Sequence, residues 1–293
     1  MTSSFPESSL TRNLSSPRTL FNTAMTVVAF ICGALALLPL LAVLSYVIIR
    51  GFSSINLDVF TQLPPAPLRG GGGFGNAILG TLVMVGIGAL ISVPFGVISA
   101  IYLTEFSSAK IAKWIRFATN VLSGVPSIIA GVFAYGVVVL TLVRLNLGSY
   151  SAIGGGFALA ILMLPIIVKT SDEALQLVSQ DLRQASVGLG ATNFQTVTQV
   201  VLPAALPAIV TGSTLAIARA SGETAPLLFT ALFSQFWPNS LFQPTASLAV
   251  LVYNFAVSPF QNWQSLAWAA SLILVLMVLV TSIIARWATR QKA

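Results

Sequence analysis

The chain has 293 residues, of which 56% are hydrophobic and 7% are charged; a soluble globular protein carries about 25% charged residues, so the composition excludes a water-soluble domain and predicts a membrane protein. The net charge of +7 does not indicate nucleic-acid binding, because the basic residues are sparse and flank apolar runs, as orientation signals in membrane proteins do. The absence of histidine excludes Ser-His-Asp catalysis and histidine-ligated zinc, and the absence of a Gly-Lys dipeptide excludes a Walker A loop, so any ATP must be bound by a partner.

The N-terminal part of the chain predicts a tail, a span and a loop. Residues 1–22 are polar and rich in Ser and Pro, which predicts a loosely ordered cytoplasmic tail. Residues 23–50 are expected to form the first transmembrane helix, because the uncharged run is far longer than the core of a signal peptide. Residues 51–75 predict a periplasmic loop. Its glycines at 70–73 fit either a hinge before the next helix or a nest of N–H groups that cradles phosphate.

Five further apolar runs are long enough to cross the bilayer. They lie within residues 77–104, 117–143, 151–168, about 204–232, and 266–285. Pro126 predicts a kink in the third of the six spans. Residues 106–116, with three basic residues and Trp114, predict a short interfacial helix, and residues 246–257 predict a re-entrant or surface helix because they are too few to cross. The sequence therefore predicts an all-α polytopic protein with six transmembrane helices.

The basic residues orient these six spans, which place both termini on the same side. With the termini in the cytoplasm, ten Lys and Arg residues fall inside and three fall outside. The inside set is Arg12, Arg18, Lys110, Lys113, Arg116, Lys169, Arg183, Arg286, Arg290 and Lys292, and the outside set is Arg50, Arg69 and Arg144. This asymmetry predicts cytoplasmic termini. Asp172 and Glu173, just past the fourth span, are expected at the start of a cytoplasmic helix, where acids favour the helix dipole and catalysis is not expected.

A polar stretch, residues 179–209, interrupts the apolar sequence. Leu182 and Leu189 fall on one face of a short amphipathic helix, and Gly190 follows it. Thr192 and Gln195 have the spacing of a capping box that starts a second short helix. Helix, glycine turn and helix form either an ordinary cytoplasmic loop or a compact knob that docks in a groove of a partner.

A family resemblance bears on this stretch. The residues that carry it are Gln184, Ala185, Ser186, Gly190, Val200, Leu202 and Pro203. At matching offsets they resemble the EAA loop of the membrane subunits of bacterial ABC importers, although Gln184, Ser186 and Val200 stand where the family has Glu, Ala and Ile. The resemblance implies that these residues, with Ala191, form the coupling loop (179–209) that is seated in an ATP-binding partner subunit.

Arg219 is the only basic residue expected well inside the bilayer, and Glu223 lies four residues later on the same helix face. A charge at the bilayer centre costs roughly 2.5 to 3.5 kcal/mol on insertion scales, so the pair should face the bundle interior or a wet cavity. An internal ion pair that fixes helix packing is one interpretation. The other is a site for a tetrahedral oxyanion, since a guanidinium fork suits such an anion and Glu223 can neutralise it in the absence of the anion.

The run Ala218-Arg219-Ala220-Ser221-Gly222-Glu223-Thr224-Ala225-Pro226-Leu227-Leu228 resembles the signature of the PstA-type permeases of phosphate ABC importers. The resemblance implies a MetI-like type I importer fold over residues 76–290 and a phosphate path lined by Arg219, Glu223 and Thr224. The implied setting is the bacterial cytoplasmic membrane, and the implied partners are a PstC-like permease, two ATP-binding subunits that hold ATP and Mg²⁺, and an extracytoplasmic phosphate-binding protein. Sulfate or molybdate is the alternative substrate, because Arg219 suits any of these anions.

Overall fold

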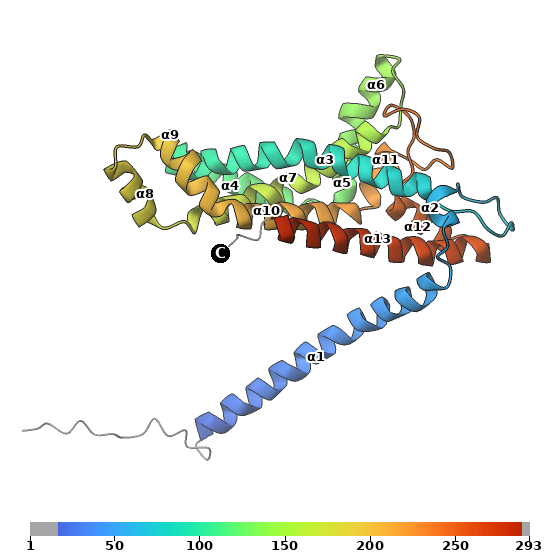
Figure 1. Cartoon of the computed structure of the whole chain (residues 1–293), viewed down its shortest axis with the longest axis horizontal. Coiled ribbons are helices and arrows are strands. Elements are labelled where there is room, and N and C mark those ends of the chain that lie inside the picture. Colours follow the sequence, from blue (N-terminus) through green and yellow to red (C-terminus); the bar gives the residue numbers. More distant parts are fainter. Residues whose placement is uncertain (1–16, 289–293) are drawn as a thin grey trace, which may run out of the picture. The chain divides into compact units, whose positions relative to one another are not determined.

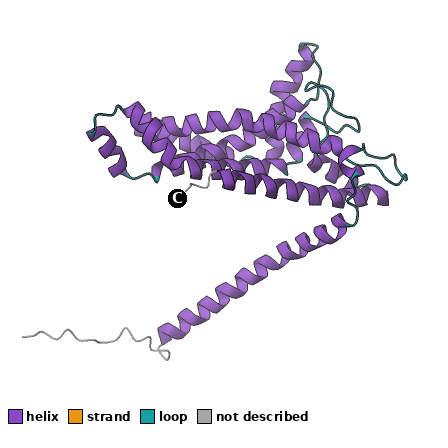
Figure 2. Cartoon of the chain, viewed as in Figure 1, coloured by secondary structure: helices purple, strands orange, loops and turns teal. Residues whose placement is uncertain are grey.

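A computed structural model describes residues 17–288, and every regular element in that part of the chain is helical (Figure 2). Six of these helical segments are long and apolar enough to cross a membrane, which confirms the predicted all-α fold of a multi-pass membrane protein. They are Pro17–Phe52, Gly75–Phe106, Ser127–Arg144, Ala152–Gln176, Asn193–Ser221 and Gln261–Trp287. Most of the predicted polar tail, with Arg12, and the C-terminal Arg290 and Lys292 lie outside the described residues.

The chain divides into two compact units after Ile49. The first contains most of α1 (Pro17–Phe52), an apolar helix long enough to cross a membrane. Residues 17–22, expected in the polar tail, are already helical.

The second unit is a bundle built around α7 (Ala152–Gln176), the most buried of the six spans. It packs against α3 (Gly75–Ile101) and α10 (Leu202–Ser221), and α10 packs against α13 (Gln261–Ala288) (Figure 1). Side chains from α3, α7, α10 and α11 (Ala225–Thr230) fill the central core, with Met84, Leu159 and Met163 fully buried. Small residues let the helices approach closely, as is typical of membrane bundles.

Two glycines of α3 provide a test of this close packing. A Cβ added at Gly80 would fall on the carbonyl oxygen of Ala246, whereas one added at Gly86 would meet nothing within 4 Å. We expect Gly80→Ala to destabilise the protein by about 1–3 kcal/mol through overpacking. Gly86→Ala is expected to stabilise it by about 0.5–1 kcal/mol, because alanine loses less backbone entropy in a helix. Thermal aggregation midpoints in detergent check this, and equal shifts for the two variants would contradict the packing.

The third span is broken rather than kinked. The interfacial helix extends to α4 (Ala109–Ser123), longer than the expected 106–116, and the span proper begins after the break. It consists of α5 (Ser127–Ala134), a π-helical turn Tyr135–Val139 and α6 (Leu140–Arg144). Pro126 takes an extended conformation at the start of α5, with ψ of 137°. Proline lacks the N–H that would continue the helix and disfavours helical backbone before it, so α4 ends and a new helix starts.

The fifth span starts and ends earlier than predicted. The second short helix of the coupling stretch, α9 (Asn193–Thr196), continues through a π-helical turn Val197–Val201 into α10 without interruption. The π turn lies just before Pro203 and accommodates its ring within a continuous helix. At the other end α10 stops at Ser221 instead of running to residue 232, because Pro226 cannot donate a helical hydrogen bond, and α11 begins at Ala225.

The remaining helices complete the bundle. The short helix predicted over 246–257 is α12 (Leu248–Ala256), and its Leu248, Leu251 and Phe255 are buried in the cluster that α12 forms with α3 and α13. The loop before α3 contains α2 (Asp58–Thr61). In that loop a Cβ at Gly73 would collide with the backbone of α2, so tight packing accounts for this glycine.

Candidate functional site

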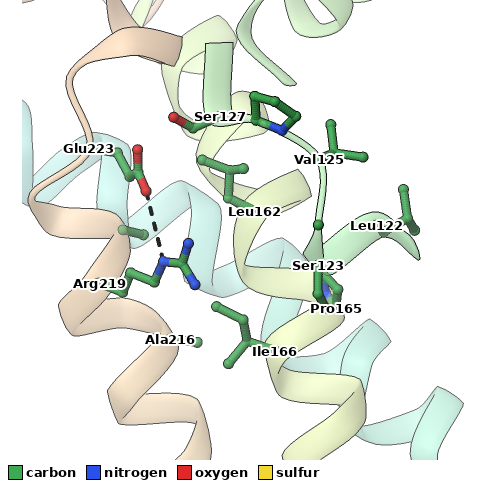
Figure 3. Close-up of a pocket in the computed structure, with 13 residues that line it drawn as sticks. Leu122, Ser123, Val125, Ser127, Leu162, Pro165, Ile166, Ala216, Arg219 and Glu223 are labelled. Atoms are coloured by element: carbon green, nitrogen blue, oxygen red, sulfur yellow. Dashed lines mark ion pairs between the residues drawn. The ribbon is translucent and has the colours of Figure 1, made fainter. Parts of the chain in front are cut away.

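A cavity of about 260 Å³ lies in the bundle about half-way along α7 (Figure 3). The α7 side chains on its wall are Leu162, Pro165 and Ile166. The end of α4 and the start of α5 form a second wall, and the end of α10 forms a third. The lining from these elements is Leu122, Ser123, Gly124, Val125, Pro126, Ser127, Ala216, Arg219, Ala220 and Glu223.

Two interrupted helices meet at this cavity. One interruption separates α4 from α5 at residues 124–126, and the other separates α10 from α11 at residues 222–224. Beyond the breaks α5 and α11 pack against each other, so closely that a Cβ at Gly131 would lie 2.6 Å from the Cα of Pro226. Breaks between consecutive helices leave backbone N–H and C=O groups without helical partners, and such groups can contact a ligand.

Arg219 and Glu223 form the charged part of the cavity. The Arg219 Nε lies 3.9 Å from Glu223 Oε1, which is an ion pair beyond hydrogen-bond distance. The Arg219 side chain is 66% exposed and that of Glu223 is 19% exposed, so the guanidinium is open to the cavity and not sealed by its partner. Figure 3 shows the guanidinium extending from α10 toward Leu162 and Ile166.

The structure brings further polar groups to the cavity that sequence reasoning did not group with Arg219. Ser123 and Ser127 both line it, and the Ser123 hydroxyl donates to the carbonyl of Thr119 at 2.9 Å. The Ser-Gly-Val-Pro-Ser run at 123–127 indicates them in the sequence, because it has one hydroxyl before Pro126 and one after it. Thr224, expected beside Arg219 and Glu223, precedes α11 and is not among the residues that line the cavity.

The chemistry of this arrangement suits a small tetrahedral anion. A guanidinium offers several N–H donors in a fixed fork, and the first N–H groups of α5 have no helical acceptor and carry the positive end of the helix dipole. The described residues contain no cluster of three His, Cys, Asp or Glu side chains that could hold a metal ion.

The coupling stretch forms the helix, turn and helix expected from its sequence. Its first helix, α8 (Gln180–Gly188), is capped by the Ser179 hydroxyl, and the predicted capping box between Thr192 and Gln195 is confirmed with both hydrogen bonds present. Gly190 has a φ of +88°, which reverses the chain between α8 and α9 and favours glycine. The Ser186 and Thr196 hydroxyls lie 3.0 Å apart and join the two helices.

Most of the predicted coupling residues lie on the surface of the chain. Gln184, Ala185, Gly190 and Pro203 are exposed, and Ser186, Ala191 and Leu202 are half-buried. Apolar side chains beside them are also exposed, with Leu189 at 91% and Phe194 at 69%. Val197 and Val201, which follow on the same helical segment, are buried. The exposed set is suited to insertion into a groove of another protein.

Asp172 and Glu173 were expected at the start of a cytoplasmic helix, and this expectation is wrong. The fourth span, α7, continues through Lys169 to Gln176, so both acids lie near the C-terminal end of a helix. Asp172 instead accepts two hydrogen bonds from Arg116 of α4, each 2.8 Å long. These bonds raise the pKa of the Arg116 guanidinium above its ordinary value, so the ion pair is maintained.

The family model of the binding-protein-dependent transport system inner membrane component matches residues 92–292. The PstA phosphate transport system permease protein of Xylella fastidiosa strain Temecula1 is 38% identical over 280 residues, which are 95% of this chain and 96% of that protein. The PstA protein of Haemophilus influenzae is 40% identical over 266 residues, covering 90% of this chain and 92% of that protein.

Solved structures show the same fold. A chain of a bacterial alginate ABC transporter, solved with an alginate-bound periplasmic protein, superposes with a TM-score of 0.63 at 17% identity and covers 93% of this chain and 95% of its own. A chain of the MetNI methionine ABC transporter superposes with a TM-score of 0.54 at 21% identity. The match covers 73% of the present chain and 92% of the transporter chain. The chain belongs to the binding-protein-dependent transport system inner membrane component family, in the branch formed by the PstA permease proteins.

Proposed function

We propose that this chain is the membrane-spanning permease subunit of an ATP-driven importer that moves inorganic phosphate across the bacterial cytoplasmic membrane. The observation that carries the proposal is the open guanidinium of Arg219 in a cavity between two interrupted helices. A charge is costly at that depth and is retained where it meets an ion in transit. The PstA names of the relatives support phosphate as that ion.

The proposed importer contains further subunits. A PstC-like permease pairs with this chain, two ATP-binding subunits hold ATP and Mg²⁺ on the cytoplasmic side, and an extracytoplasmic protein delivers phosphate. Both termini of this chain are cytoplasmic, and the chain itself binds no cofactor. Closure of the ATP-binding subunits moves the coupling stretch through its exposed apolar side chains, so that the cavity opens alternately to the two sides.

Glu223 bears on which tetrahedral anion the cavity accepts. Phosphate and arsenate keep a proton near neutral pH and can donate a hydrogen bond to a carboxylate. Sulfate and molybdate are fully ionised, so a carboxylate next to the guanidinium repels them. The position of Glu223 on the cavity wall, with its Oε1 3.9 Å from the Arg219 Nε, therefore favours phosphate over sulfate or molybdate.

This preference is tested by protection of Arg219 from phenylglyoxal in the purified permease pair, with the modified site identified by mass spectrometry. We expect phosphate and arsenate to slow the modification roughly tenfold, and sulfate to have little effect. Bound sulfate would leave the Glu223 carboxylate without a donor, which costs about 1.4 kcal/mol or more, and about 1.4 kcal/mol corresponds to a tenfold difference in affinity. Glu223→Gln should remove the difference, because an amide can donate to sulfate as well as accept from phosphate.

The control is Arg144, an exposed residue at the end of α6 that is not among the residues lining the cavity. Its modification rate should be the same with every anion. Protection of Arg219 by sulfate as strong as that by phosphate in the unmodified protein would favour the wider oxyanion specificity. An Arg219 that no anion protects would count against the binding site itself.

A further inference from the structure

A buried polar network lies between the coupling stretch and the cavity, and nothing in the proposed transport path uses it. It contains two ion pairs, Arg116 with Asp172 and Arg183 with Glu105. The exposed fractions of the side chains are 8% for Asp172, 11% for Glu105 and 13% for Arg183, whereas Arg116, at the end of the network, is 41% exposed. Buried ion pairs contribute little net free energy of folding. A more specific role for these two pairs is to hold the helices that they join in one relative position.

The first pair holds α4 against α7. Asp172 accepts hydrogen bonds of 2.8 Å from Arg116 Nε, Arg116 Nη2, Thr104 Oγ1 and Gln176 Nε2. Ser123 and Pro165 line the cavity. Arg116 lies seven residues before Ser123 on α4, and Asp172 lies seven residues after Pro165 on α7. Seven helical residues span about 10 Å. The pair is therefore two helical turns from the cavity on each of the two walls that it joins.

The second pair holds α8 against the bundle. Arg183 Nη2 donates to Glu105 Oε1 at 2.9 Å and to the carbonyl of Leu175 at 2.8 Å, and Nη1 donates to the carbonyl of Val178. These carbonyls belong to the C-terminal end of α7 and the residues after it, where helical acceptors lack partners. Apart from this side chain, α8 is mainly exposed. A displacement of α8 therefore moves Arg183 and, with it, Glu105.

The two pairs meet on one π-helical turn, Tyr102–Phe106, at the end of α3. Thr104 of this turn bonds Asp172, and its neighbour Glu105 bonds Arg183. A π turn is a locally wide piece of helix that is frequent at functional sites. The chain of contacts from α8 to α4 thus passes through two consecutive residues of this turn.

We propose that this network, Arg183–Glu105–Thr104–Asp172–Arg116, transmits displacement of α8 to α4 and so moves the wall of the Arg219 cavity formed by residues 122–126. The inference rests on the proposed function, in which an ATP-binding partner displaces α8. Arg183 and Asp172 are positioning residues here: they touch neither substrate nor ATP, and they couple the two ends of the path through fixed contacts.

The test uses the complete importer in proteoliposomes and measures phosphate uptake per ATP hydrolysed, together with the stimulation of hydrolysis by the phosphate-loaded binding protein. We expect Arg183→Gln and Asp172→Asn each to lower uptake per ATP by roughly tenfold, within the usual range of coupling between two sites. The double variant Arg183→Gln, Glu105→Gln should be no worse than Arg183→Gln alone, because both changes interrupt the same link. Arg183→Lys, which keeps the charge, should recover part of the loss.

Lys113→Gln is the matched control, since Lys113 lies on α4 one turn before Arg116 and is exposed. It should leave uptake per ATP unchanged. A merely structural network would lower the yield of assembled importer and its thermal midpoint but keep uptake per ATP constant in the complexes that remain, and that result would overturn the inference. An unmodified importer that moves no phosphate would instead overturn the proposed function, so the two failures are distinguishable.

Discussion

Replacing Arg219 with glutamine is expected to lower phosphate uptake by the assembled importer about 100-fold. Glutamine keeps much of the side-chain length but loses the charge and the fork of N–H donors, and hydrogen bonds to charged groups contribute about 1.5–3 kcal/mol each. The loss should be large because the cavity offers no second basic side chain among its lining residues. Radiolabelled phosphate accumulation in proteoliposomes, normalised to the amount of inserted protein, measures the effect.

Two matched variants sharpen this result. Arg219→Lys retains the charge without the fork and should keep intermediate activity. Arg144→Gln removes an exposed arginine from the end of α6, away from the cavity, and should have no effect on uptake. Uptake by Arg219→Gln equal to that of the unmodified protein at the same expression would mean that the Arg219–Glu223 pair serves helix packing alone.

The second large effect is expected at the turn between α8 and α9. Deletion of Gly190, Ala191 and Thr192 removes the left-handed glycine and the hydroxyl that caps α9, so the two helices cannot fold back on each other. We expect uptake to fall below one-tenth of normal and the stimulation of ATP hydrolysis by the loaded binding protein to disappear. The spans should still insert, because the turn is exposed and contributes little to the buried core.

Single substitutions at neighbouring glycines provide the control. A Cβ at Gly188 or at Gly190 meets nothing within 4 Å, but only Gly190 has a positive φ. Gly188→Ala should therefore be silent, and Gly190→Ala should weaken coupling modestly, because alanine costs about 1–2 kcal/mol in the left-handed conformation. Undiminished stimulation of ATP hydrolysis in the deletion variant would identify this stretch as an ordinary loop.

Much of this molecule is predictable from local sequence. The six spans follow from long apolar runs, of which only the fifth contains charges in its interior, and the start of α9 follows from the spacing of Thr192 and Gln195, since both depend on interactions over a few residues. Arg219 and Glu223 are conspicuous for a related reason, because an intramembrane charge pair at helical spacing is rare and costly. Their position on the wall of one cavity is consistent with the predicted path, which the transport and protection experiments test.

Long-range geometry was not predictable in the same way. A proline in an apolar run indicates that a helical hydrogen bond is missing, but it does not distinguish Pro207, which lies inside the continuous helix α10, from Pro126, at which the helix breaks completely. Asp172 was misplaced because α7 extends beyond its apolar stretch, which the composition alone does not reveal. Its partner Arg116 is 56 positions away in sequence, and only the packing of α4 on α7 brings the two together.

The π-helical turn at Val197–Val201 has a consequence for how the helix Asn193–Ser221 meets its surroundings. A turn of this kind holds one residue more than an α turn, so it rotates every later side chain by about 100° relative to those before it. Val197 and Val201, the first and last residues of the turn, are both buried. A helical wheel drawn with one uniform period would therefore assign the lipid-facing and protein-facing sides of this segment incorrectly.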